Sequence, residues 1–133
     1  MRSLPSLLIC AFVLASCASQ PVQISANKCW SVSAGEKVEG TAVLFANAQN
    51  DACIECGASV SGRDCPGVGF AAGNNSVDQA YDHIVQSARA DGFGFVQPVV
   101  YLSGEVIPNG ATGKPMIRAN QLRLIEAGQQ NGS

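Results

Sequence analysis

A single stretch of helical periodicity stands among several short β-prone runs, and this pattern limits the chain to a mainly β fold with one helix. Ser76 and Gln79 have the spacing of a capping box at the start of that helix. Gly92, directly after Asp91, predicts its end. The apolar side chains between these signals recur at spacings of three and four, which places them on one helix face: Val77, Ala80, Tyr81, Ile84, Val85 and Ala88.

Three β-prone segments precede the helix. Residues 37–47 are rich in β-branched and aromatic side chains, and Gly40 within them predicts a bend or a bulge. Residues 52–60 and 67–72 flank the turn-like sequence Ser61-Gly62-Arg63-Asp64. The two flanking segments therefore predict a hairpin.

Two further strands follow the helix. Residues 93–107 are aromatic and β-branched, and Pro98 within them predicts a strand start or an edge because proline cannot donate to a central ladder. The turn-rich residues 108–114 separate this segment from the returning segment 116–126. The alternation of apolar and polar side chains in 116–126 is only partly regular.

Three strands, one helix and two strands, in that order, resemble the OB-fold, a small five-stranded Greek-key barrel. The stretch VYLSGEVIPNGATGKPMIRANQLRLIE also resembles the last hairpin of such domains, where a strand with an internal glycine precedes a TGK-type loop. The resemblance covers residues 37–126 and implies a binding face on the second and third strands with the adjoining loops. Those strands have few aromatic residues, which argues against stacking of nucleic-acid bases. A generic α+β sandwich has the same element order and is the alternative.

The first 16 residues have the parts of an export signal. Arg2 is the positive charge, residues 4–14 form an apolar core of 11 residues, and the small residues Ala15 and Ser16 follow. This core is shorter than the roughly 20 residues that a membrane-spanning helix needs. We therefore expect residues 1–16 to be removed.

The sequence Leu14-Ala15-Ser16-Cys17 resembles the lipobox of bacterial lipoproteins. The resemblance implies cleavage before Cys17, diacylation of its sulfur and acylation of its new amino group, so that acyl chains anchor the protein in a membrane. Ala18 and Ser19, with no aspartate directly after the cysteine, resemble lipoproteins that are passed to the outer membrane. We expect the protein at the periplasmic face of that membrane. Ordinary signal cleavage near Ala18 is the alternative.

The mature chain is long enough for one domain with its own core. Residues 17–36 are expected to hold the lipidated N-terminus, a flexible tether over residues 18–27 and the first cysteine. Residues 37–126 are expected to form the single globular domain, and residues 127–133 a flexible tail.

Four cysteines remain once Cys10 leaves with the signal and Cys17 is acylated: Cys29, Cys53, Cys56 and Cys65. An even number in an exported domain predicts a disulfide framework, with three connectivities open. The expected hairpin favours Cys56 with Cys65, which leaves Cys29 to pair with Cys53.

Cys53 and Cys56 also have the spacing of a redox dithiol, so a thiol–disulfide redox protein is the alternative function. Against it, Glu55 lies between them and the following sequence does not favour a helix. A zinc site is not expected, because the chain has one CxxC pair and exported cysteines are usually oxidised. Asp51 and Asp64, with Glu55, lack the ligand spacing of a calcium loop and are interpreted as solubilising turn residues.

The remaining candidates indicate a non-enzymatic protein without a cofactor. His83 falls on the polar helix face without a nearby nucleophile, so we expect it to be solvent-exposed. Trp30 is expected to cover a disulfide in the core, with a ligand surface as the alternative. The net charge of −2 and the absence of a basic run argue against nucleic acid as a partner. We therefore expect a membrane-anchored binding or assembly module for an envelope protein or glycan.

Overall fold

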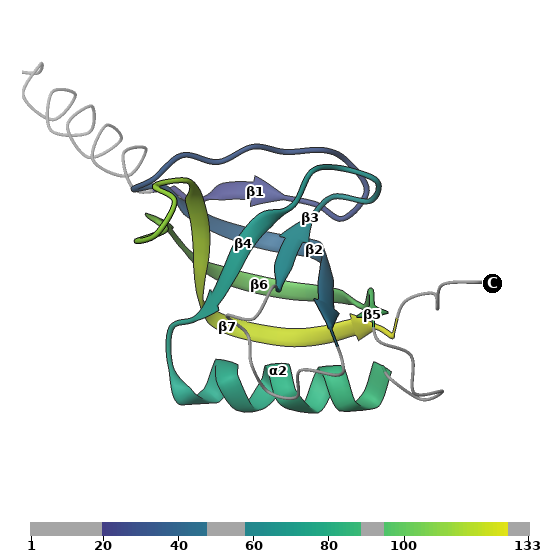
Figure 1. The fold of residues 1–133 in the computed structure, drawn as a ribbon. Coiled ribbons are helices and arrows are strands. Elements are labelled where there is room, and N and C mark those ends of the chain that lie inside the picture. The colour runs from purple at the N-terminus through teal and green to yellow at the C-terminus, as the bar shows by residue number, and fades with distance from the viewer. Residues whose placement is uncertain (1–19, 48–57, 89–94, 128–133) are drawn as a thin grey trace, which may run out of the picture.

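The computed structural model describes residues 20–47, 58–88 and 95–127. These residues form a mainly β unit with one helix (Figure 1). The elements are β1 (Val22–Ile24), β2 (Lys37–Asn47), β3 (Ser59–Ser61), β4 (Val68–Ala72), α2 (Asn75–Ala88), β5 (Phe95–Val96), β6 (Val99–Pro108) and β7 (Pro115–Glu126).

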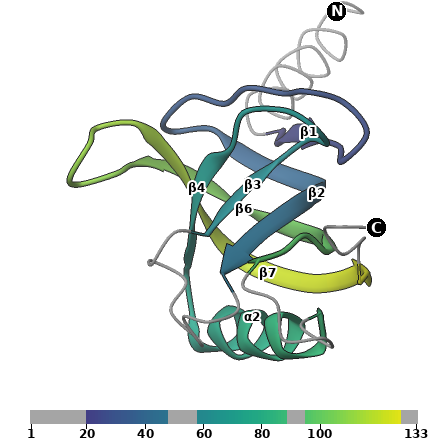
Figure 2. The ribbon, with the colours of Figure 1, turned by 45° about the vertical axis from the view of Figure 1, so that its right-hand side comes forward.

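Five of these strands close into a barrel. β2 pairs with β3, β3 with β4, β4 with β7, β7 with β6, and β6 returns to β2. The pairing of β4 with β7 is parallel, whereas the other pairs in the ring are antiparallel. The expected OB-fold-like class and its order of elements are confirmed. Figures 1 and 2 show α2 lying across one end of the barrel.

The barrel interior and the inner face of α2 form one apolar core. Its largest fully buried side chains include Phe70, Leu44, Leu102 and Ile117. The expected helix face is confirmed: Val77, Tyr81, Ile84, Val85 and Ala88 are buried, and Ala80 at its edge is half-buried. The Tyr81 ring stacks on Phe70 with ring centroids 6.4 Å apart. Burial raises the pKa of the Tyr81 hydroxyl above its ordinary value.

The cap of α2 differs from the expected capping box. The Val77 backbone N–H donates to Asn74 Oδ1 at 2.9 Å, so Asn74 caps the helix and Ser76 lies inside its first turn. Asn74 Nδ2 also donates to Asn120 O on β7 at 3.1 Å. This second bond explains the choice of cap, because it ties the start of α2 to the barrel. Gly92, the expected end, lies outside the described residues.

The strands follow the expected segments. β2 has the expected bounds, and β3 and β4 form the expected hairpin, although residues 52–57 lie outside the described part. Pro98 lies between β5 and β6, where its carbonyl accepts the Leu44 N–H at 2.9 Å. In β7, Ala119 pairs with Gly104 and Gln121 with Ser103, which leaves Asn120 as a bulge. Beyond this bulge the side chains that point into the barrel change from odd to even positions of β7, which explains the irregular alternation of the sequence.

The expected tether is wrong for residues 20–27. Val22–Ile24 pairs in parallel with β2, and Ile24 and Ala26 are only 5% and 3% exposed. Gly40 permits this contact, because its φ is +140° and a Cβ there would lie 2.0 Å from Ile24 O. The folded unit therefore begins well before residue 37. Residues 18 and 19, like residues 128–133 of the expected tail, lie outside the described residues.

In the part of the chain that the structure describes, no helix has the length and apolar character needed to cross a membrane.

Candidate binding groove

A disulfide joins Cys29 to Cys65, so the two expected pairs, Cys56 with Cys65 and Cys29 with Cys53, are wrong. The cause is the path of the N-terminal segment, which passes over the β3–β4 turn. The Arg63 N–H donates to Ala26 O at 2.8 Å, and a Cβ on Gly62 would lie 1.9 Å from Lys28 O. These backbone contacts bring Cys29 against the turn. Cys17, Cys53 and Cys56 lie outside the described residues.

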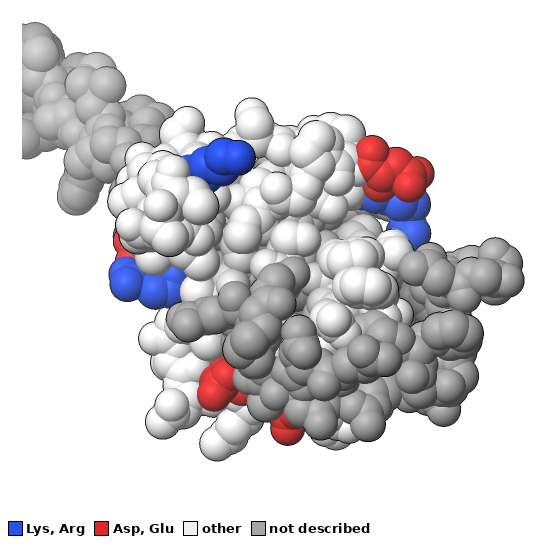
Figure 3. Space-filling model, viewed as in Figure 1, with Lys and Arg blue, Asp and Glu red and all other residues white. Residues whose placement is uncertain are grey.

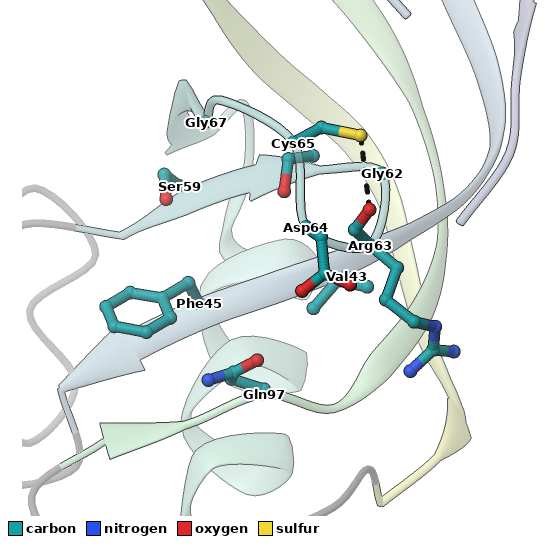
Figure 4. A pocket seen from close by; sticks show the side chains of 10 residues that line it. Val43, Phe45, Ser59, Gly62, Arg63, Asp64, Cys65, Gly67 and Gln97 are labelled. Carbon is teal, nitrogen blue, oxygen red and sulfur yellow. Dashed lines mark hydrogen bonds between the residues drawn. The ribbon is translucent and has the colours of Figure 1, made fainter. Parts of the chain in front are cut away.

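A groove of about 350 Å³ lies beside this disulfide on the outer surface of the barrel (Figure 4). It lies between β2, β3 and the β3–β4 turn. The side chains that give it its chemistry are Val43, Phe45, Ser59, Ser61, Asp64 and Gln97.

The β pleat places four of these side chains on one face. Phe45 pairs with Ser59 and Val43 pairs with Ser61, and side chains directly opposite each other point to the same side of a sheet. Leu44, between the two outward residues of β2, is fully buried in the core. The alternation of the strands therefore gives the groove an apolar row beside a row of hydroxyls.

Phe45 forms an exposed aromatic pair with Phe95. Their ring centroids are 5.1 Å apart with an interplanar angle of 25°, and the residues are 36% and 49% exposed. β5 brings them together, because Phe95 pairs with Asn47 at the end of β2. Two large exposed aromatic rings at the end of a polar groove are typical of a binding surface.

Asp64 contributes a carboxylate from the β3–β4 turn. Its φ of +61° places it in the left-handed region, which Asp adopts more readily than most residues. Figure 4 shows the Asp64 carboxylate and the Ser59 hydroxyl directed into the groove; Arg63 also lines it, with its guanidinium at the end away from Phe45. Asp64 was interpreted from the sequence as a solubilising turn residue; the structure gives it a position on the groove.

The disulfide holds this turn in place. Cys65 follows Asp64 directly, its N–H donates to Gly62 O at 3.2 Å, and its sulfur is bonded to Cys29. Cys65 Sγ also lies 3.2 Å from Arg63 O (Figure 4). This is a packing contact and not a hydrogen bond, because a disulfide sulfur has no S–H to donate. The Asp64 backbone is therefore fixed by a covalent bond on one side and by the Ala26–Arg63 hydrogen bond on the other.

Trp30 lies at a second, more apolar hollow of about 430 Å³, with Val32, Val68, Lys114 and Pro115. Its side chain packs against the main core, and its Nε1 is buried without a hydrogen-bond partner in the described part of the chain. Cys29 is exposed, so the disulfide is at the surface. The expectation that Trp30 covers a disulfide in the core is therefore wrong.

Charge is sparse around these features. In the part of the face in Figure 3 that is not drawn in grey, uncharged side chains cover most of the surface and the few acidic and basic groups are scattered. Glu105 and Arg118 form an ion pair on the barrel wall. Among residues 20–47, 58–88 and 95–127, no three His, Cys, Asp or Glu side chains are close enough to hold a metal ion. His83 is exposed on α2, as expected.

Sequence reasoning missed the aromatic pair. The resemblance implied a face on the second and third strands, which are β3 and β4, but the aromatic side chains come from β2 and β5. Phe45 occupies an outward position of an alternating strand, which was a usable signal. Nothing local to Phe95 indicated that it would lie beside Phe45.

A scan against protein-family models finds no match, and no curated protein and no solved structure matches the chain.

Proposed function

We propose that this protein is a lipid-anchored, non-enzymatic binding module of the cell envelope, at the periplasmic face of the outer membrane. Its groove holds a protein or an envelope glycan. The observation that carries this proposal is the groove itself: its lining residue Phe45 stacks on the exposed ring of Phe95, and two serine hydroxyls of β3 and the Asp64 carboxylate lie beside a disulfide-linked turn. A rigid site with an apolar surface and a few polar groups is suited to recognition.

The anchor is proposed at Cys17, from the lipobox-like sequence. β1 starts at Val22, so the chain between the anchor and the barrel is short. Five Cα–Cα steps span at most about 18 Å when fully extended. The groove would therefore stay close to the membrane surface, and a partner would have to come to it.

Site-specific photocrosslinking in intact cells tests the binding function. A photoreactive phenylalanine analogue at Ser61, on the groove, is expected to crosslink to a discrete envelope partner. The same analogue at His83, exposed on α2, is the matched control and is expected to give no such product. Equal crosslinking from both positions, or none from Ser61, would contradict the proposal.

A thiol–disulfide redox protein is the second candidate, and the Cys29–Cys65 pairing favours it. After loss of the signal and acylation of Cys17, that pairing leaves Cys53 and Cys56 as the remaining cysteines. In this role the Cys53 and Cys56 thiols would reduce a partner disulfide, giving two partner thiols and a Cys53–Cys56 disulfide. Alkylation of the native protein after mild reduction tests it: modification of both thiols without denaturation supports this role, and a bridge that resists until denaturation argues against it.

A further inference from the structure

We infer that the groove recognises an uncharged sugar ring. This inference rests on the proposed binding function and names the ligand class. It depends on three properties of the groove: its aromatic surface, its hydrogen-bonding groups and the sign of its charge.

The aromatic pair supplies an apolar surface for one face of a ring. Phe45 and Phe95 expose about a third to a half of their surface while stacked at 5.1 Å. One face of a pyranose ring presents several C–H groups, which pack against the negative face of an aromatic ring. The same sugar presents hydroxyl groups around its rim, so it needs polar partners beside the aromatic surface.

The polar side chains of the groove match that rim. Ser59 lies directly across from Phe45 in the β2–β3 register, and Ser61 lies across from Val43. Both hydroxyls can donate and accept, and the Asp64 carboxylate accepts hydrogen bonds from hydroxyl groups. Figure 4 shows Ser59 and Asp64 directed into one space, with Phe45 at one end of it.

The charge of the groove selects an uncharged ligand. Asp64 and Arg63 both line the groove, one charge of each sign, and Figure 4 shows the Arg63 guanidinium at the end of the groove away from Phe45. The chain also has a net charge of −2, so phosphate or uronate groups would be repelled. A purely apolar ligand would cover Ser59 and Asp64 without pairing them, which is unfavourable for polar groups removed from water.

Calorimetric titration of the full mature protein tests this ligand class. The probes are tetra-N-acetylchitotetraose and cellotetraose, which are neutral, and tetragalacturonate, which is anionic. The protein is kept in a phosphocholine detergent, because maltoside and glucoside detergents themselves contain sugar. Saturable binding of at least one neutral tetrasaccharide, with weaker or no binding of tetragalacturonate, is the expected result.

Three variants locate the binding. Asp64→Asn keeps a residue that tolerates positive φ while removing the charge, and is expected to weaken affinity by ~10-fold. Phe95→Leu keeps apolar bulk but removes the ring, and is expected to weaken affinity about 5-fold. Asp78→Asn removes a carboxylate that is exposed on α2 and does not line the groove, and is expected to leave affinity within about 2-fold.

No binding of either neutral probe at millimolar concentration would overturn the sugar inference, as would binding that Asp64→Asn and Phe95→Leu leave unchanged. Tighter binding of tetragalacturonate would also overturn it. If the Ser61 crosslink then still captures a protein, the binding function stands and only the ligand class fails. If that crosslink fails too, both fall.

Discussion

Cys29 and Cys65 are 36 residues apart in the sequence, and their disulfide brings their Cα atoms to 5.5 Å. The bond fixes the N-terminal segment over the turn that carries Asp64. Because the same turn forms one wall of the groove, the disulfide links the stability of the fold to the geometry of the candidate site.

Replacing both cysteines with serine, in the double variant Cys29→Ser with Cys65→Ser, is expected to lower the free energy of unfolding by about 2–4 kcal/mol. The physical reason is the larger conformational freedom of the unfolded chain without the crosslink. Urea denaturation measures the change, with the Cys53→Ser and Cys56→Ser double variant as the control with the same number of substitutions. A Cys29/Cys65 variant as stable as the parent would show that this disulfide does not hold the turn.

Replacing Gly40 with alanine is expected to detach β1. The added Cβ would lie 2.0 Å from Ile24 O at a φ of +140°, so the strand or the backbone must move. Positions of this kind cost about 1–3 kcal/mol when occupied by a residue with a side chain. Gly110→Ala is the matched control, because a Cβ there meets nothing within 4 Å. Hydrogen exchange at Val22–Ile24 should accelerate in Gly40→Ala only; unchanged protection would argue against the close approach of the two strands.

Replacing Asn74 with alanine is expected to destabilise the protein by about 1 kcal/mol, because the Val77 N–H loses its side-chain acceptor. Ser76→Ala tests the capping box that the sequence suggested, and is expected to change stability by less than about 0.5 kcal/mol. Thermal unfolding of the two variants measures both. A larger loss for Ser76→Ala than for Asn74→Ala would restore the original assignment of the cap.

Alkaline unfolding should depend on Tyr81. Burial raises the pKa of its hydroxyl in the folded state above the ordinary value of 10.0. Above pH 10 the folded chain therefore keeps a proton that the unfolded chain loses. The free energy of unfolding is unaffected well below pH 10 and falls as the pH rises from about 10 through the raised pKa of the folded state. Tyr81→Phe should remove this contribution, whereas Tyr101→Phe should retain it because Tyr81 is still present. Denaturation at a series of alkaline pH values measures the slope; the same slope in Tyr81→Phe would contradict the assignment.

Hydrophobic periodicity predicted the long elements, because each of them repeats one pattern of apolar and polar residues over many positions. The stripe from Val77 to Ala88 and the long strands Lys37–Asn47 and Pro115–Glu126 were recognisable because many residues repeat one alternation. β1 was missed because three residues are too few to show a period, and the polar, small residues around it resemble a linker. Asn74 was missed as the cap because its second hydrogen bond depends on Asn120, which is distant in sequence.

The groove could be predicted only in part. Outward positions on β2 and β3 follow from the pleat, so Phe45, Ser59 and Ser61 could have been placed on one surface. The pairing of Cys29 with Cys65 depends on the path of the N-terminal segment over the turn, which no local pattern encodes. The contact between Phe45 and Phe95 depends on the pairing of β5 with β2, which are separated in sequence by β3, β4 and α2.

The central claim is that the disulfide-fixed groove is where this protein holds its ligand. Backbone amide chemical-shift mapping during titration of the mature protein with the neutral tetrasaccharide tests it most directly. The predicted result is a set of saturable shifts centred on Phe45, Ser59, Ser61, Asp64 and Phe95, with little change along α2. Shifts centred instead on the hollow beside Trp30, or on α2, would contradict the account.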